Sequence, residues 1–163
     1  MILIYAGAVP VSDGPKSSDF ADLSARAKLL LHDLAKHGNN DIILPTVAIS
    51  ELLVPVPIAQ HGPLMAALRK RFICQTHDLL AATIAATIWA QYKQLPPDHR
   101  YENRHVLKSD AMIVAASKAA GARRFYSHDA KCRKMAELAG MVARDLPTNG
   151  EDLFSKQEID END

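Results

Sequence analysis

Short apolar runs alternate with stretches of helical periodicity along most of this chain. The alternation favours parallel strands joined by helices, because parallel neighbours need a long crossover connection and a helix supplies it. We therefore predict an α/β fold with three α/β/α layers and a central, mainly parallel sheet. The expected strands span residues 2–5, 42–44, 72–76, 124–127 and 141–143, and the expected helices span residues 19–34, 46–53, 63–69, 78–95, 110–120 and 130–139.

Several residues mark the expected ends of these helices. Thr46 and Ser109 are of types that cap helix N-termini, and we expect Ser109 to cap a helix that starts at Asp110. Gly38 and Gly121 follow the last apolar positions of two helical patterns, where a C-terminal glycine is common.

Length and charge indicate one domain with an acidic tail. The chain of 163 residues fits a single core, and we place this domain at residues 1–148. Residues 149–163 hold six acidic residues and one basic residue, so we predict a disordered tail. Of the 19 acidic and 19 basic residues in the chain, 13 acidic and 18 basic ones remain in residues 1–148, a net charge of +5. A mildly basic domain suits a polyanionic partner.

Other classes of protein receive no support from the sequence. No run of about 18 apolar residues occurs, so we predict no transmembrane helix. No basic segment precedes the first apolar residues, so we expect a cytoplasmic protein without a secretory signal. Cys74 and Cys132 lie far apart and have no paired histidines nearby, which does not indicate a zinc site. We expect two free thiols, one of them buried in a strand.

Three carboxylates fall where the expected fold would bring them together. In an open parallel sheet, ligands bind at the carboxyl ends of the strands. Asp129 follows the fourth expected strand, Asp110 opens an expected helix, and Glu51 lies in the helix after the second strand. Each residue also has a simpler explanation: Asp110 as a first-turn acid on a helix dipole, Asp129 as an N-cap and Glu51 as a solvated side chain.

The same residues lie in motifs that resemble those of the PIN domain, the fold of many VapC-type toxin ribonucleases. The matching positions are Pro45, Val47, Glu51 and Leu52 of P-x-V-x-x-x-E-L, Lys108 and Asp110 before an apolar helix, and Ser127, Asp129 and Gly140 around the helix before the last strand. The resemblance covers nearly all of residues 1–146 and depends on the order and spacing of the motifs together.

The resemblance is incomplete at the first strand. The family carries a leading Asp in a motif such as D-T-N-I-L-I-Y-A, whereas this chain begins M-I-L-I-Y-A-G-A, with Met1 in the place of the Asn. Either the Asp is encoded upstream, which the rest of the site favours, or this protein has lost it. Without this carboxylate, we expect weak metal binding and low or no activity.

The resemblance implies hydrolysis of phosphodiester bonds in RNA with Mg²⁺ or Mn²⁺, ions that prefer hard oxygen ligands. Asp110 and Asp129 would bind the metal directly or through water, and Glu51 would bind the metal or orient the attacking water. Ser127 would hydrogen-bond to a metal-bound water or to a carboxylate.

Basic side chains near these carboxylates would hold the phosphates of RNA without reading its sequence. The candidates are Arg104, Lys108, Arg124 and Lys131, with an ordinary solvated surface as the alternative. The resemblance also implies a small antitoxin protein as partner and a homodimer. A PIN-like module that binds nucleic acid or protein without catalysis remains open. A doubly wound enzyme for small molecules ranks last, because the sequence has no glycine-rich phosphate loop and no G-x-S-x-G.

Overall fold

The structure is a computed structural model that describes residues 18–36, 40–97 and 104–148, with the backbone alone for residues 18–21 and 104–105. The chain divides into two compact units. One unit consists of residues 41–145, and the other joins residues 2–40 to residues 146–163. Each unit is described by itself.

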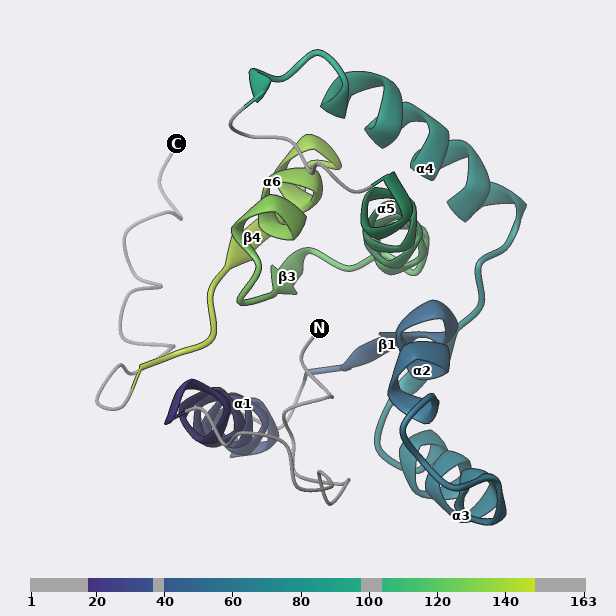
Figure 1. Ribbon diagram of the computed structural model, residues 1–163, viewed down its shortest axis with the longest axis vertical. Helices are drawn as coiled ribbons and strands as arrows, with labels where there is room; N and C mark the ends of the chain where they lie inside the picture. The colour runs from purple at the N-terminus through teal and green to yellow at the C-terminus, as the bar shows by residue number, and fades with distance from the viewer. Residues whose placement is uncertain (1–17, 37–39, 98–103, 149–163) are drawn as a thin grey trace. The chain divides into compact units, whose positions relative to one another are not determined.

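The unit of residues 41–145 is a mixed α/β structure (Figure 1). Its elements, in chain order, are β1 (Ile43–Pro45), α2 (Thr46–Leu53), α3 (Ile58–Arg69), β2 (Ile73–Gln75), α4 (Leu79–Tyr92), α5 (Arg104–Ala119), β3 (Arg124–Tyr126), α6 (Ala130–Leu138) and β4 (Val142–Arg144). The alternation expected from the sequence is therefore confirmed, with most boundaries within three residues of the prediction.

The four strands form two parallel pairs. β1 pairs with β2, with Leu44 opposite Cys74, and β3 pairs with β4, with Phe125 opposite Ala143. Within the described ranges these pairs are separate two-stranded sheets, so no single central sheet joins them. The expected strand of residues 2–5 lies outside the described residues.

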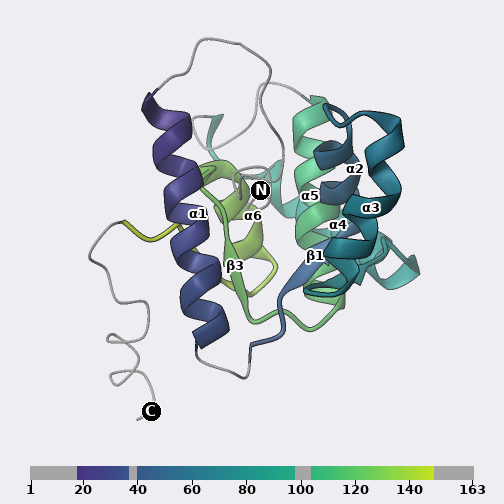
Figure 2. The same cartoon turned by 90° about the horizontal axis from the view of Figure 1, so that it is seen from below.

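Helix α5 is the centre of this unit. It packs against α2, α4, α6 and β1, and Figures 1 and 2 show it beside α4 and α2 respectively. Residues 113–117 of α5 are all buried, so this part of the helix has no solvent-facing side. A helix that is apolar on all sides belongs in a core.

Helix α5 starts earlier than the sequence predicts. It begins at Arg104 instead of Asp110, so Ser109 lies inside the helix and does not cap it. Leu107 is buried in the added part, and burial of this apolar side chain stabilises the extra turn. The explanation of Asp110 as a first-turn acid is therefore wrong, because the helix dipole acts mainly within the first turn.

Two further helix starts differ from the prediction. Pro45, and not Thr46, occupies the N-cap position of α2, and no side chain caps this helix. Helix α3 begins at Ile58, five residues before the expected start, after the extended residue Pro57. Pro63 therefore lies inside α3 and does not begin it.

Glycines end α5 and α6. Gly121 and Gly140 have φ angles of +82° and +70°, which favour glycine. The amides that follow them, of Ala122 and Met141, donate back to carbonyls inside the helices, those of Ser117 and Ala136. The helix end expected at Gly121 is confirmed, and it has the form of a Schellman-type cap.

The second unit contains α1 (Ser18–Lys36), as the helical pattern of residues 19–34 predicts. The Arg26 guanidinium donates from Nε to the Pro147 carbonyl over 3.1 Å and from a terminal nitrogen to the Leu146 carbonyl. These bonds connect α1 to the segment after β4 within the same unit. The expected end at Gly38 and the expected acidic tail lie outside the described residues. No described helix has the length and hydropathy needed to span a membrane.

Candidate functional site

Three consecutive residues of α5 contact or approach three different helices. The Lys108 Nζ lies 5.5 Å from the centroid of the Trp89 ring on α4. The Ser109 hydroxyl donates to the Glu51 carboxylate on α2. The Asp110 carboxylate acts on the Cys132 thiol of α6. Each step along an α-helix turns the side chain by about 100°, so Lys108 and Asp110 lie on nearly opposite sides of α5.

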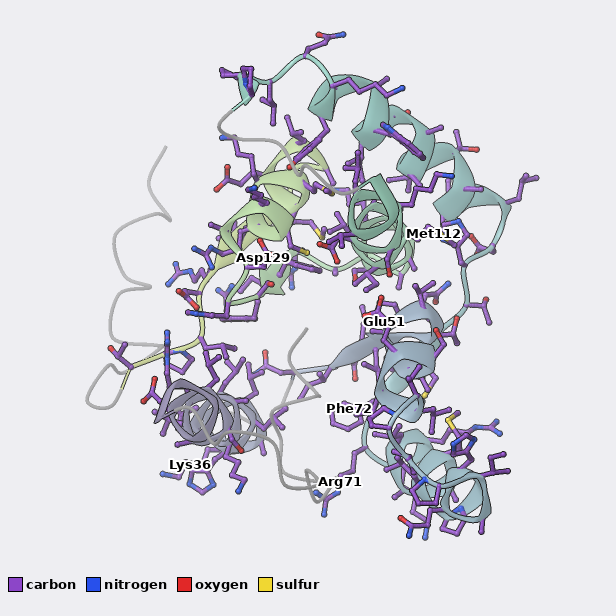
Figure 3. All side chains as sticks on the ribbon, viewed as in Figure 1. Lys36, Glu51, Arg71, Phe72, Met112 and Asp129 are labelled. Carbon is purple, nitrogen blue, oxygen red and sulfur yellow. The ribbon has the colours of Figure 1, made fainter. Side chains whose placement is uncertain are left out.

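Glu51 is held by the hydrogen bond from Ser109. Its neighbours Ile49 and Leu52 are buried, and Glu51 itself is half-buried on α2. The explanation of Glu51 as a fully solvated side chain is therefore wrong. The bond joins residues 58 positions apart in the sequence and links α2 to α5. Figure 3 labels Glu51 on α2.

The turn between β3 and α6 carries the second part of the site. Ser127 is 1% exposed, and its hydroxyl accepts a bond of 3.2 Å from the Asp129 amide. Asp129 caps α6, with Oδ1 accepting from the amides of Lys131 and Cys132 over 2.7 and 3.2 Å. The simpler explanation of Asp129 as an N-cap thus describes one of its two carboxylate oxygens.

Cys132 is a buried residue of α6, three positions after Asp129. Burial is the main reason why the pKa of its thiol rises to about 12, and the negative charges of Asp110 and Asp129 act in the same direction. A side-chain hydrogen bond with Ser127 acts in the opposite direction. Two carboxylates, one on α5 and one at the start of α6, therefore lie near enough to this thiol for their charges to act on it. The buried thiol lies on a helix and not in a strand as expected, and Cys74 is the half-buried thiol of β2.

A network of polar contacts holds the β3–α6 turn in place. Arg133 on α6 donates from one nitrogen to the carbonyls of Ser127 and His128 over 2.7 and 2.8 Å. Asp145, just after β4, lies 3.0 Å from His128 Nδ1 and 3.5 Å from the Arg133 guanidinium. The turn that presents Asp129 is thus tied both to α6 and to the end of β4.

The basic residues expected to bind RNA lie in different places. Lys131 follows Asp129 in the first turn of α6. Arg124 is exposed at the amino end of β3, whereas Asp129 follows the carboxyl end of that strand. Lys108 faces Trp89, on the other side of α5 from Asp110. The side chain of Arg104 lies outside the described residues.

The carboxylates of Glu51, Asp110 and Asp129 are ligands of the type that hard cations prefer, but the described residues do not form a complete coordination shell. Among the side chains described, no three His, Cys, Asp or Glu residues are grouped closely enough to hold a metal ion. The charges of Asp110 and Asp129 both act on the Cys132 thiol, so these two carboxylates lie in the same region of the unit. Mg²⁺ commonly binds through one or two carboxylates and completes its shell with waters and substrate phosphates. Two carboxylates are compatible in chemistry with that mode of binding, and Glu51 accepts a hydrogen bond from Ser109, the residue before Asp110.

Several of these contacts have only weak signals in the sequence. Cys132 follows Asp129 by three residues, which places both in the first turn of α6. Nothing local to Ser109 or Asp145 indicates that they contact Glu51 and Arg133. Comparison of the chain with protein-family models, curated proteins and solved structures gave no match.

Proposed function

We propose that this chain is a divalent-metal-dependent ribonuclease of the PIN type. The observation that carries the proposal is that α5 and α6 pack against each other and bring Asp110 and the N-cap residue Asp129 into the region of the same buried residue, Cys132. Glu51, held by Ser109, adds a third carboxylate on the adjoining helix. Two further components belong to this proposal: a three-layer α/β/α fold with one central, mainly parallel sheet, and RNA as the substrate.

The carboxylates have distinct roles in this proposal. Asp110 and the Asp129 oxygen that does not cap α6 would hold Mg²⁺ or Mn²⁺, and Glu51 would orient water near them. The chemistry that such an ion supplies when bound is activation of water and stabilisation of negative charge at the phosphate. Ser127 positions Asp129 by accepting a hydrogen bond from its amide. Lys131, in the first turn of α6, would contact a phosphate of the substrate.

Metal binding and cleavage test the proposal together. Calorimetric titration of the full chain with Mn²⁺ should show binding that Asp110→Asn weakens by at least tenfold. Cleavage of a single-stranded RNA should be low in this chain and stronger after an Asp is restored ahead of Ile2, and in both cases it should require Mn²⁺ or Mg²⁺ and stop in EDTA. Asn keeps the size of the Asp110 side chain and removes its charge, so folding should be retained. Strong Mn²⁺-dependent cleavage by the Asp110→Asn chain would refute the role of this residue.

One observation favours a second candidate, a PIN-like module that binds nucleic acid or protein without catalysis. The described carboxylates have structural partners: Ser109 donates to Glu51, and Asp129 caps α6. Metal-independent RNA binding with no cleavage in either Mg²⁺ or Mn²⁺, even after an Asp is restored ahead of Ile2, would select this candidate. A small antitoxin and a second copy of the chain are the proposed partners of the ribonuclease.

A further inference from the structure

Trp89 lies beside two lysines from different helices. Its indole is in the last turn of α4, and Lys93, four residues later, lies on the same side of that helix. The Lys93 Nζ is 5.3 Å from the ring centroid, and the Lys108 Nζ of α5 is 5.5 Å from it. Both distances are within the range of cation–π interaction.

The surroundings make this a positive surface with an aromatic component. Helix α4 has no charged residue between Leu79 and Tyr92. Both lysines are exposed and Trp89 is half-buried, so solvent reaches the group. Aromatic rings beside basic side chains are the usual elements of sites for single-stranded nucleic acid, where bases stack on the ring and phosphates contact the cations.

We propose that Trp89, Lys93 and Lys108, here called the indole platform, form a subsite for single-stranded RNA. The proposal rests on the proposed function and extends it by naming a second place where the substrate is held. Lys108 directly precedes Ser109 and Asp110, but it lies on nearly the opposite side of α5 from Asp110. The platform would therefore hold nucleotides beyond the phosphate that is cut.

The chain provides its own probe for this subsite. Trp89 is its single tryptophan, so the intrinsic indole fluorescence reports on the platform alone. Titration of the full chain with oligouridylate in EDTA, where no metal-dependent cleavage occurs, should quench this emission as bases stack on the ring. Heparin, which has charge but no bases, should quench much less. Unchanged emission at saturating oligouridylate would overturn the proposal.

Matched lysine variants test the charged part. Lys93→Gln/Lys108→Gln keeps chain length and helix propensity, and Lys28→Gln/Lys70→Gln removes the same charge from exposed positions on α1 and after α3. Each phosphate contact on a single strand contributes about 0.7 to the slope of log K against log salt concentration. The platform pair should lower that slope by about 1.4. The control pair should leave it almost unchanged.

The aromatic part is tested with Trp89→Leu, which keeps an apolar side chain between α4 and α5. Binding of a labelled oligouridylate, followed by fluorescence anisotropy, should weaken roughly fivefold to hundredfold. A platform that only connects α4 to α5 would lower the melting temperature of the variants and leave oligonucleotide affinity equal to that of the control pair. That result would overturn the subsite.

The outcomes separate this subsite from the proposed function. Asp110→Asn should abolish cleavage and leave oligouridylate quenching of Trp89 intact. Quenching without any cleavage, even by a chain with an Asp restored ahead of Ile2, would refute the ribonuclease and retain the subsite. Cleavage with no response from Trp89 would refute the subsite and retain the ribonuclease.

Discussion

Replacing Ser109 with alanine removes the hydroxyl that donates to the Glu51 carboxylate. A hydrogen bond to a charged group contributes about 1.5–3 kcal/mol to stability. Both residues are only half-buried, so we expect the lower end, about 1.5 kcal/mol. Ser109 lies inside α5, where alanine has the better helix propensity by about 0.5 kcal/mol. The net loss in free energy of unfolding should therefore be about 1 kcal/mol.

A double-mutant cycle separates the bond from other effects of the substitution. Glu51→Ala combined with Ser109→Ala should give an interaction energy of about 1.5 kcal/mol, because either change alone removes the same bond. Ser117→Ala is the matched control on α5, since its hydroxyl donates over 3.0 Å to the Ile113 carbonyl of its own helix. The control cycle with Glu51→Ala should be additive to within about 0.5 kcal/mol.

Urea denaturation followed by circular dichroism gives these free energies, provided that the chain unfolds in one cooperative transition. An interaction energy below about 0.5 kcal/mol between positions 51 and 109 would refute the reasoning. A cost of Ser109→Ala that is independent of Glu51 would be the behaviour of an N-cap. In that case the start of α5 at Arg104 would be wrong as well.

Three further predictions concern the β3–α6 turn and α6. Asp129→Asn should preserve stability, because Asn caps helices as well as Asp does, but it should lower the Mn²⁺ affinity measured by calorimetry. Asp129→Ala should lower the Mn²⁺ affinity too, and it should lower the free energy of unfolding by about 1 kcal/mol in urea denaturation. Arg133→Ala should cost about 2 kcal/mol in urea denaturation, because two backbone carbonyls and the Asp145 carboxylate each lose one of their polar contacts. Lys134→Ala, which breaks an exposed ion pair with an N–O distance of 2.9 Å, should cost under about 0.5 kcal/mol by the same measurement. Burial raises the pKa of the Cys132 thiol from 9.0 to about 12. Between these two values the folded state keeps the proton and the unfolded state releases it. The free energy of unfolding should therefore keep its full value below pH 9 and fall by up to about 1.4 kcal/mol per pH unit between pH 9 and 12. Cys132→Ala should remove that pH dependence. If the free energy of unfolding of the variant falls between pH 9 and 12 as steeply as that of the wild-type chain, Cys132 is not its cause.

The sequence by itself determined the type and order of the described elements. Apolar periodicity and end signals such as Gly121 predict helices such as α4 and α6 and the short strands of this unit. Both kinds of signal depend on residues at most about four positions apart. Asp129 was also found locally, since an acid just after a strand and before a helix is both an N-cap and a candidate ligand. The start of α5 was missed because the polar residues before Val106 carry no signal for a helix start. The burial of Leu107 stabilises the earlier start, and that burial depends on tertiary contacts.

Tertiary structure decided which side chains meet. Lys108, Ser109 and Asp110 are neighbours in the sequence, yet they face Trp89, Glu51 and Cys132 on three different helices. Their directions follow from the 100° turn per residue, but the identity of each partner depends on how α2, α4 and α6 pack around α5. Periodicity indicates that one side of a helix is apolar, but not which distant segment covers it. For this reason the three carboxylates could be named from the sequence, whereas the hydrogen bond from Ser109 to Glu51 and the effect of Asp110 on the Cys132 thiol could not.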